Sequence, residues 1–122
     1  MPPPDAAFLG HMLNAIDRLA DLVARTDRGV FDQDWVVQDA VIRELEVLGE
    51  AAGRISPAFV QAHPEIPWRA ITGIRHKLIH DYFVVDLGIV WQTATVNVPA
   101  VAPLLRAATA TPDFPRPDEP AR

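Results

Sequence analysis

Apolar residues follow helical spacing over long stretches of the chain. In the first stretch, residues 8–23 repeat apolar positions at the i, i+3, i+4 and i+7 spacing of an amphipathic helix, with Asp5 as predicted N-cap and Gly29 as stop signal. A second stripe covers residues 34–55 and is unusually wide. We therefore predict two amphipathic helices, the second of them packed against more than one neighbour.

Proline marks the boundaries of the next elements. Ser56-Pro57 has the sequence of an N-cap followed by proline at the first helical position, which predicts a short helical turn through Gln61. Pro67 repeats this pattern. It therefore predicts a third helix that starts at Trp68 and ends at about Asp81 or Phe83.

A fourth helix is predicted to follow a cap at Asp86. Its apolar positions continue past Pro99 to Leu105, so we expect a kink at the proline. Two segments could instead form strands: residues 82–85 by composition, and residues 93–98 because polar and apolar residues alternate there. For the second segment we favour helix, since the apolar spacing on either side is helical.

Four helices with short links predict an all-α fold, an up-and-down four-helix bundle with one short extra helical turn. Seven of the 12 prolines lie within residues 2–4 or 112–120, where packed elements would not form easily. We expect one domain over residues 1–110. We expect residues 111–122 to be a disordered proline-rich tail.

Composition narrows the classes of function. A chain of 122 residues with 49% hydrophobic and 22% charged residues is typical of one globular domain. Its net charge of −5 argues against binding nucleic acid through a broad basic surface, and the lack of cysteine excludes disulfides and thiolate zinc sites. The glycines form no phosphate-binding loop. Without a leader-like or membrane-spanning segment, we expect a cytoplasmic protein.

Residues capable of acid, base or phosphate chemistry are concentrated in residues 75–82. On a continuous helix, Arg75 and Tyr82 would share the apolar arc, while His80 would lie roughly 140° from Arg75, on the side of His76. Arg75 and His80 could therefore act on one phosphate only if the helix ended before His80 or a two-fold axis added a second copy. Tyr82 would also suit the edge of a core with its hydroxyl in water.

Each of these residues also has a structural interpretation. The stem of Arg75 could pack on the core while its guanidinium extends to solvent or pairs with an acid such as Glu46 or Glu50. Alternatively, the guanidinium could bind a phosphate through two nitrogens. His76 and His80 could lie on a solvated face or add charge at a helix C-terminus. Their spacing would suit two metal ligands, but the run lacks the glutamate of a metalloprotease helix. We predict no metal site.

The run from Arg75 to Tyr82 has the order Arg, four residues, His, one residue, Tyr. It resembles the motif of HepT-like toxins in the HEPN superfamily of small helical nucleases. The surrounding sequence is similar as well, over about residues 6–108, with the clearest agreement in residues 38–52, 64–68 and 85–91.

This resemblance implies a ribonuclease, a metal-independent RNA endonuclease that works as a homodimer and needs no cofactor. It would be the toxin of a type VII-like toxin–antitoxin system, with Arg75 and His80 as catalytic residues. The antitoxin would be a minimal MNT-type nucleotidyltransferase that transfers AMP to Tyr82. His76 stands where many members have asparagine, so His76 and Lys77 are auxiliary candidates.

The chemistry can also be derived from the residue types. Cleavage of RNA without metal uses the 2′-hydroxyl as nucleophile, so the protein has to move protons and stabilise charge on the phosphoryl oxygens. A histidine suits the proton transfers and a guanidinium suits the anion. Two alternatives stay open: a non-catalytic module that binds nucleotide or substrate and docks a nucleotidyltransferase, and a dimeric helical scaffold.

Overall fold

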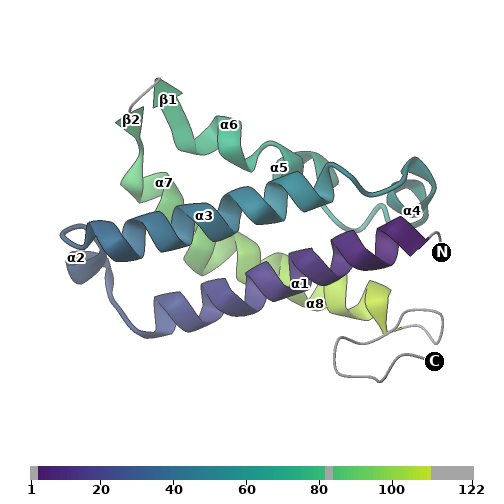
Figure 1. The fold of residues 1–122 in the computed structure, drawn as a ribbon, viewed down its shortest axis with the longest axis horizontal. Helices are drawn as coiled ribbons and strands as arrows, with labels where there is room; N and C mark the ends of the chain where they lie inside the picture. Colours follow the sequence, from purple (N-terminus) through teal and green to yellow (C-terminus); the bar gives the residue numbers. More distant parts are fainter. Residues whose placement is uncertain (1–2, 82–83, 111–122) are drawn as a thin grey trace.

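The computed structural model describes residues 3–81 and 84–110, and most of them are helical (Figure 1). The long helices α1 and α3 pack along each other, α8 packs on α1, and α5 and α6 pack on α3. The prediction of an all-α helical bundle is confirmed. The elements in chain order are α1 (Pro3–Ala24), α2 (Arg28–Phe31), α3 (Trp35–Ala52), α4 (Pro57–Ala62), α5 (Trp68–Thr72), α6 (Ile74–Leu78), β1 (Ile79–Asp81), β2 (Val84–Val85), α7 (Leu87–Gln92), the π-helix η1 (Thr93–Asn97) and α8 (Val98–Thr109).

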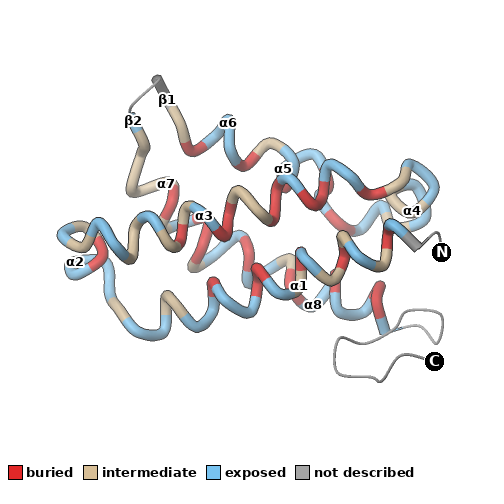
Figure 2. Tube along the Cα trace, in the orientation of Figure 1, coloured by how far each residue is buried: buried red, intermediate tan, exposed pale blue. Residues whose placement is uncertain are grey.

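The core lies between the long helices. Its fully buried side chains include Leu9 and Met12 from α1, Leu45 and Leu48 from α3, and Leu105 from α8. In Figure 2, buried positions on these helices alternate with exposed ones at helical spacing. The wide stripe predicted on α3 is explained by its position, since α1 covers one side of this helix and α5 and α6 cover another.

Two predicted helix caps, at Ser56 and Asp86, are confirmed, and a third cap that was not predicted lies at Asp34. The carboxylate of Asp34 accepts hydrogen bonds from two backbone N–H groups at the start of α3, and that of Asp86 accepts one at the start of α7. Ser56 caps α4, with Pro57 at the first helical position. These short polar side chains satisfy N–H groups that have no partner within the helix.

The predicted cap at Asp5 is wrong. Asp5 lies inside the first turn of α1 and is only 1% exposed, because its carboxylate accepts hydrogen bonds from the backbone N–H (2.8 Å) and hydroxyl (2.6 Å) of Ser56. The stop signal at Gly29 is also wrong. Helix α1 ends at Ala24, and Gly29 belongs to the short helix α2, which has its own cap at Asp27.

The third helix was predicted too long and continuous. It is divided at Gly73 into α5 and α6, and it ends at Leu78, where Ile79 takes extended dihedral angles (φ −107°, ψ 111°). The chain then forms a two-stranded antiparallel hairpin, in which Ile79 pairs with Val85 and Asp81 with Val84.

A hydrogen bond from a residue outside α6 stabilises the hairpin at the end of this helix. The backbone N–H of Asp86 donates to the carbonyl oxygen of Leu78 (3.1 Å), so the end of α6 is satisfied by the returning strand and not by further helix. The strand considered for residues 82–85 is therefore present at Val84–Val85. Tyr82 and Phe83 lie outside the described residues.

The fourth helix changes its geometry before Pro99. The segment considered as a strand is the π-helix η1, so the preference for helix is confirmed. The hydroxyls of Thr93 and Thr95 each donate to the carbonyl oxygen four residues earlier, at 2.7 Å, and the N–H of Val98 reaches back five residues to Thr93. Pro99 has no N–H to donate. The wider turn of η1 lies directly before this proline, at the place where we expected a kink.

None of the described helices is long and apolar enough to cross a membrane. The disorder predicted for residues 111–122 concerns a segment outside the described residues, and the predicted domain limits stay a prediction.

Replacing the buried carboxylate tests the link between α1 and α4. We expect Asp5→Ala to lower the free energy of unfolding by about 2 kcal/mol, because two hydrogen bonds to a charged acceptor are lost and the hydroxyl of Ser56 loses its acceptor. Urea unfolding measures the change. The exposed Asp39→Ala on α3 is the control and should change stability by less than about 0.5 kcal/mol. Equal effects of the two substitutions would contradict this account.

Candidate active site

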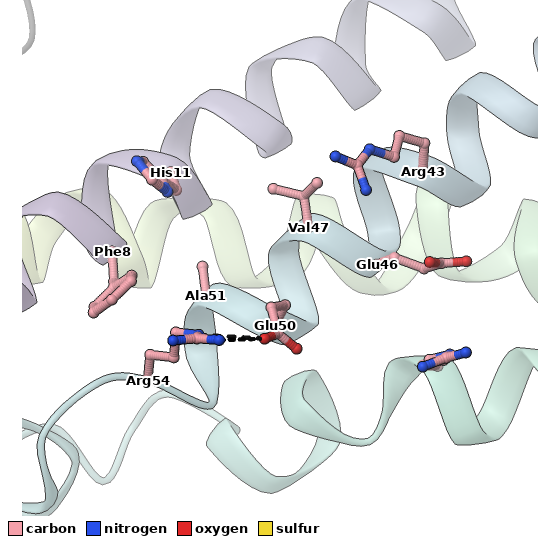
Figure 3. A pocket seen from close by; sticks show the side chains of 9 residues that line it. Phe8, His11, Arg43, Glu46, Val47, Glu50, Ala51 and Arg54 are labelled. Atoms are coloured by element: carbon pink, nitrogen blue, oxygen red, sulfur yellow. Dashed lines mark hydrogen bonds and ion pairs between the residues drawn. The ribbon is translucent and has the colours of Figure 1, made fainter.

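Arg75 lies on α6 with its side chain exposed, next to a polar cavity. This cavity has a volume of about 350 Å³ and takes its lining from α1, α3, α6 and the turn after α3. Figure 3 shows how the labelled side chains of α1, of α3 and of the turn after α3 surround it. We call it the polar cavity; its lining residues are Phe8, His11, Arg43, Glu46, Val47, Glu50, Ala51, Arg54 and Arg75.

Gly49 lies where α3 packs closely against α5, the helix that leads into α6. This residue is buried on α3, and a Cβ atom there would lie 3.1 Å from the carbonyl oxygen of Ile71 in α5 and 3.8 Å from the Cβ of Ile74 in α6. A side chain here would require α5 to shift by a few tenths of an ångström, so glycine favours this close approach of α3 and α5. Arg75 follows Ile74 directly, so this contact holds α6 beside the face of α3 that lines the polar cavity.

The charges around the polar cavity are only partly compensated. Arg54 donates to Glu50 (3.0 Å) and also lies over the ring of Phe8, 5.9 Å from its centroid (Figure 3). Arg43 and Arg75 have no ion pair or hydrogen bond within the described part of the chain. The ion pair with Glu46 or Glu50 that the structural interpretation allowed is therefore not formed. The exposed guanidinium fits the other form of that interpretation, a side chain that extends to solvent, and it is also available to an anion.

The two auxiliary candidates, His76 and Lys77, lie in different surroundings. His76 is exposed and lines none of the cavities described here. Lys77 is exposed and lines a second, larger cavity on the other side of α6, between α5–α6 and η1–α8. Within the described residues, neither side chain has an ion pair. The structure thus separates Lys77 from Arg75.

His80 follows the end of the helix. Its backbone is the middle residue of β1, after α6 has ended at Leu78. This meets one of the two conditions under which Arg75 and His80 could act on one phosphate. The side chain of His80 and all of Tyr82 lie outside the described residues, so their roles stay predictions.

The sequence reasoning named Glu46 and Glu50 as possible partners of Arg75 but missed the other cavity residues of α3. Arg43, Val47 and Glu50 follow one another at spacings of four and three residues, which places them on one face of this helix, and Arg54 follows just after the helix ends at Ala52. This spacing was readable from the sequence. What the sequence could not show is that this face lies opposite Arg75, because that depends on the packing at Gly49.

Comparison with known proteins gives a consistent result. The family model described as ribonuclease HepT-like matches residues 12–108. The chain is 39% identical over 93 residues to a protein of Thermococcus cleftensis named "Probable ribonuclease HepT", an alignment that covers 73% of this chain and 84% of that protein. It is 38% identical over 102 residues to a protein of Methanocaldococcus jannaschii named as a putative RNase, with 83% and 88% covered.

A third relative, from Caldanaerobacter subterraneus, is also named as a putative RNase and is 36% identical over 92 residues, covering 75% of this chain and 82% of that protein. No solved structure gives a significant match. The family match spans most of the described bundle and includes the whole run of residues 75–82. The chain therefore belongs to the ribonuclease HepT-like family of the HEPN superfamily.

Proposed function

We propose that the protein is a metal-independent RNA endonuclease and the toxin of a type VII-like toxin–antitoxin system. Membership of the ribonuclease HepT-like family supports a ribonuclease. One observation of the structure carries the proposal further: the guanidinium of Arg75 is exposed, has no partner within the described residues and lines the polar cavity, and the helix that bears it ends two residues before His80.

The proposed reaction is an internal transfer at phosphorus. A base removes the proton of the 2′-hydroxyl, the 2′-oxygen bonds to phosphorus, and the bond from phosphorus to the 5′-oxygen breaks as an acid protonates that oxygen. The products are a 2′,3′-cyclic phosphate and a free 5′-hydroxyl. His80 suits the proton transfers, because histidine titrates near neutral pH, and Arg75 stabilises the negative charge on the phosphoryl oxygens.

A homodimer would complete this machinery. Each chain supplies one His80, whereas the reaction needs a base and an acid at the same time. A two-fold axis that brings two copies of residues 75–82 together would provide two imidazoles and two guanidinium groups. His76 and Lys77 are auxiliary groups in this scheme.

Neutralisation would act through Tyr82. A partner nucleotidyltransferase of the MNT type would transfer AMP from ATP to the phenol oxygen and release pyrophosphate. The added phosphodiester carries a negative charge and the nucleoside adds bulk, so both would keep RNA away from Arg75 and His80. The protein has a net charge of −5 and offers little other attraction to RNA.

Substituting the proposed catalytic residues tests the nuclease. With single-stranded RNA in excess EDTA, we expect His80→Ala to reduce the cleavage rate at least about 10²-fold, as for loss of a general acid–base group. Arg75→Ala should cost a similar factor, because the transition-state charge loses its cation. Gel analysis of the 5′-hydroxyl products measures both.

Arg25→Ala is the matched control, since Arg25 is exposed, pairs with Asp21 and lines none of the cavities described here. It should cleave at the rate of the unsubstituted protein, and circular dichroism should show all three variants folded. Near-normal cleavage by either His80→Ala or Arg75→Ala would refute the assignment. Tight RNA binding without any cleavage by the unsubstituted protein would instead support the non-catalytic docking module.

AMP transfer gives a separate test. Incubation with the partner nucleotidyltransferase and ATP should add AMP to the unsubstituted protein, as seen by intact mass, and should suppress cleavage. Tyr82→Phe should gain no AMP and should keep its own cleavage rate, because phenylalanine has no oxygen to accept the nucleotide. Scoring each protein as the ratio of its rates with and without ATP removes any effect of the substitution on the basal rate. Modification of Tyr82→Phe would show that the acceptor is another residue.

A further inference from the structure

The second cavity, on the side of α6 away from the polar cavity, has a different character. It has a volume of about 530 Å³ and lies between α5–α6 and η1–α8. Its walls are mainly apolar, with Ile71, Ile74, Val96 and Val101 among them, and two cations also line it. We call it the apolar cavity. Its size and composition are those of a small-molecule site.

Within the described residues, the cations of the apolar cavity have no ion pair. Five arginines of the described chain, namely Arg18, Arg25, Arg28, Arg54 and Arg106, each contact a carboxylate at 2.6 to 3.3 Å. Four cations have no such contact within residues 3–81 and 84–110. Arg43 and Arg75 line the polar cavity, and Arg69 and Lys77 line the apolar cavity.

The apolar cavity also lacks acidic groups. Among the described residues, neither aspartate nor glutamate lines it, so Arg69 and Lys77 have no internal counter-charge there. Arg69 and Lys77 are both exposed and, within the described residues, have no ion pair, so they are free to bind an anion that enters the apolar cavity. An arginine and a lysine in this position suit a phosphate.

The remaining lining fits the rest of a nucleotide. The apolar walls can cover the face of a base, and Asn97 carries an amide that can both donate to and accept from a base edge. The hydroxyl of Thr93 donates to the carbonyl of Ile89 and keeps its lone pairs. Both residues come from η1, and π-helices occur often at functional sites.

We propose that the apolar cavity is a nucleotide-binding subsite that takes one nucleotide of the RNA near the scissile phosphate, with the phosphate on Arg69 and Lys77 and the base against the apolar wall. The link to RNA cleavage rests on the proposed function. Lys77 lies two residues after Arg75, about 200° around α6, so an RNA strand held at Arg75 reaches the subsite by crossing one helix.

Binding of AMP tests the subsite directly. Methyl NMR of the full chain should show shifts at Ile71, Ile74, Val96 and Val101 on addition of AMP, and smaller shifts with adenosine or inorganic phosphate alone. A short RNA with a 2′-deoxy sugar at the cleaved position should compete with AMP for the same shifts. If AMP shifts these methyl groups but the RNA does not compete, the subsite serves a free nucleotide, and the RNA part of the proposal is wrong.

Two variants connect the subsite with cleavage. Ala100→Phe places a ring in the apolar cavity, and Ala107→Phe is its control, since Ala107 is exposed on the same helix and does not line the cavity. Arg69→Gln removes one cation, with Arg25→Gln as control. We expect Ala100→Phe and Arg69→Gln each to raise the KM for RNA about tenfold, as for one lost charge-assisted contact, while kcat stays within about twofold.

The outcomes separate this proposal from the proposed function. If AMP shifts none of the four methyl groups and Ala100→Phe keeps the normal KM, the subsite is refuted, while cleavage by the unsubstituted protein still supports the nuclease. If AMP binds there but RNA is never cleaved, the nuclease fails and the nucleotide site stands. If Ala100→Phe instead changes the mass seen in sedimentation and AMP has no effect, the cavity is a protein interface and the proposal is overturned.

Discussion

Helix α3 packs against α5 and α6 at Gly49 without an intervening side chain, because a Cβ atom there would lie only 3.1 Å from the carbonyl oxygen of Ile71. Arg75 lies on α6, and residues of these two short helices line the cavities. Their distance from α3 therefore determines the shape of the site. A larger residue at position 49 would have to move α5, and α6 follows after Gly73 alone. At position 49, glycine matters mainly because it has no side chain, and its conformational freedom matters less.

This packing makes α6 a partition between two cavities of different chemistry. The polar cavity on one side contains Glu46 and Glu50 beside its arginines, whereas no acidic residue of the described chain lines the apolar cavity on the other side. The four cations without carboxylate partners are divided equally between them. The net charge of −5 therefore describes the surface poorly, since the excess of acid lies elsewhere and the positive charge beside α6 is local.

Much of the fold could be predicted from the sequence, because the caps at Ser56 and Asp86 act through their own neighbours in the chain. The predictions were wrong where a residue far away in the sequence determines the local structure. Asp5 is of a residue type that often caps helices, yet its carboxylate accepts hydrogen bonds from Ser56, the cap of another helix. Ile79 and Asp81 fit a helical pattern, yet pairing with Val84–Val85 makes them a strand. In the site, Arg75 was predicted from its residue type, and Glu46 and Glu50 of α3 were named as possible partners. The contribution of Arg43 was not predicted, since packing brings it there.

The end of α6 at Leu78 also changes the reason for expecting a dimer. On a continuous helix, Arg75 and His80 would lie on different sides, and a second copy would be needed to bring an arginine and a histidine to one phosphate. With His80 on an extended strand, that angular conflict disappears within a single chain. What remains is a chemical requirement: the proposed reaction needs a base at the 2′-hydroxyl and an acid at the 5′-oxygen, and each chain supplies one His80 as the proposed proton carrier. The case for a homodimer therefore depends on the number of proton carriers, with His76 as the one other histidine in the motif that could remove that need within a single chain.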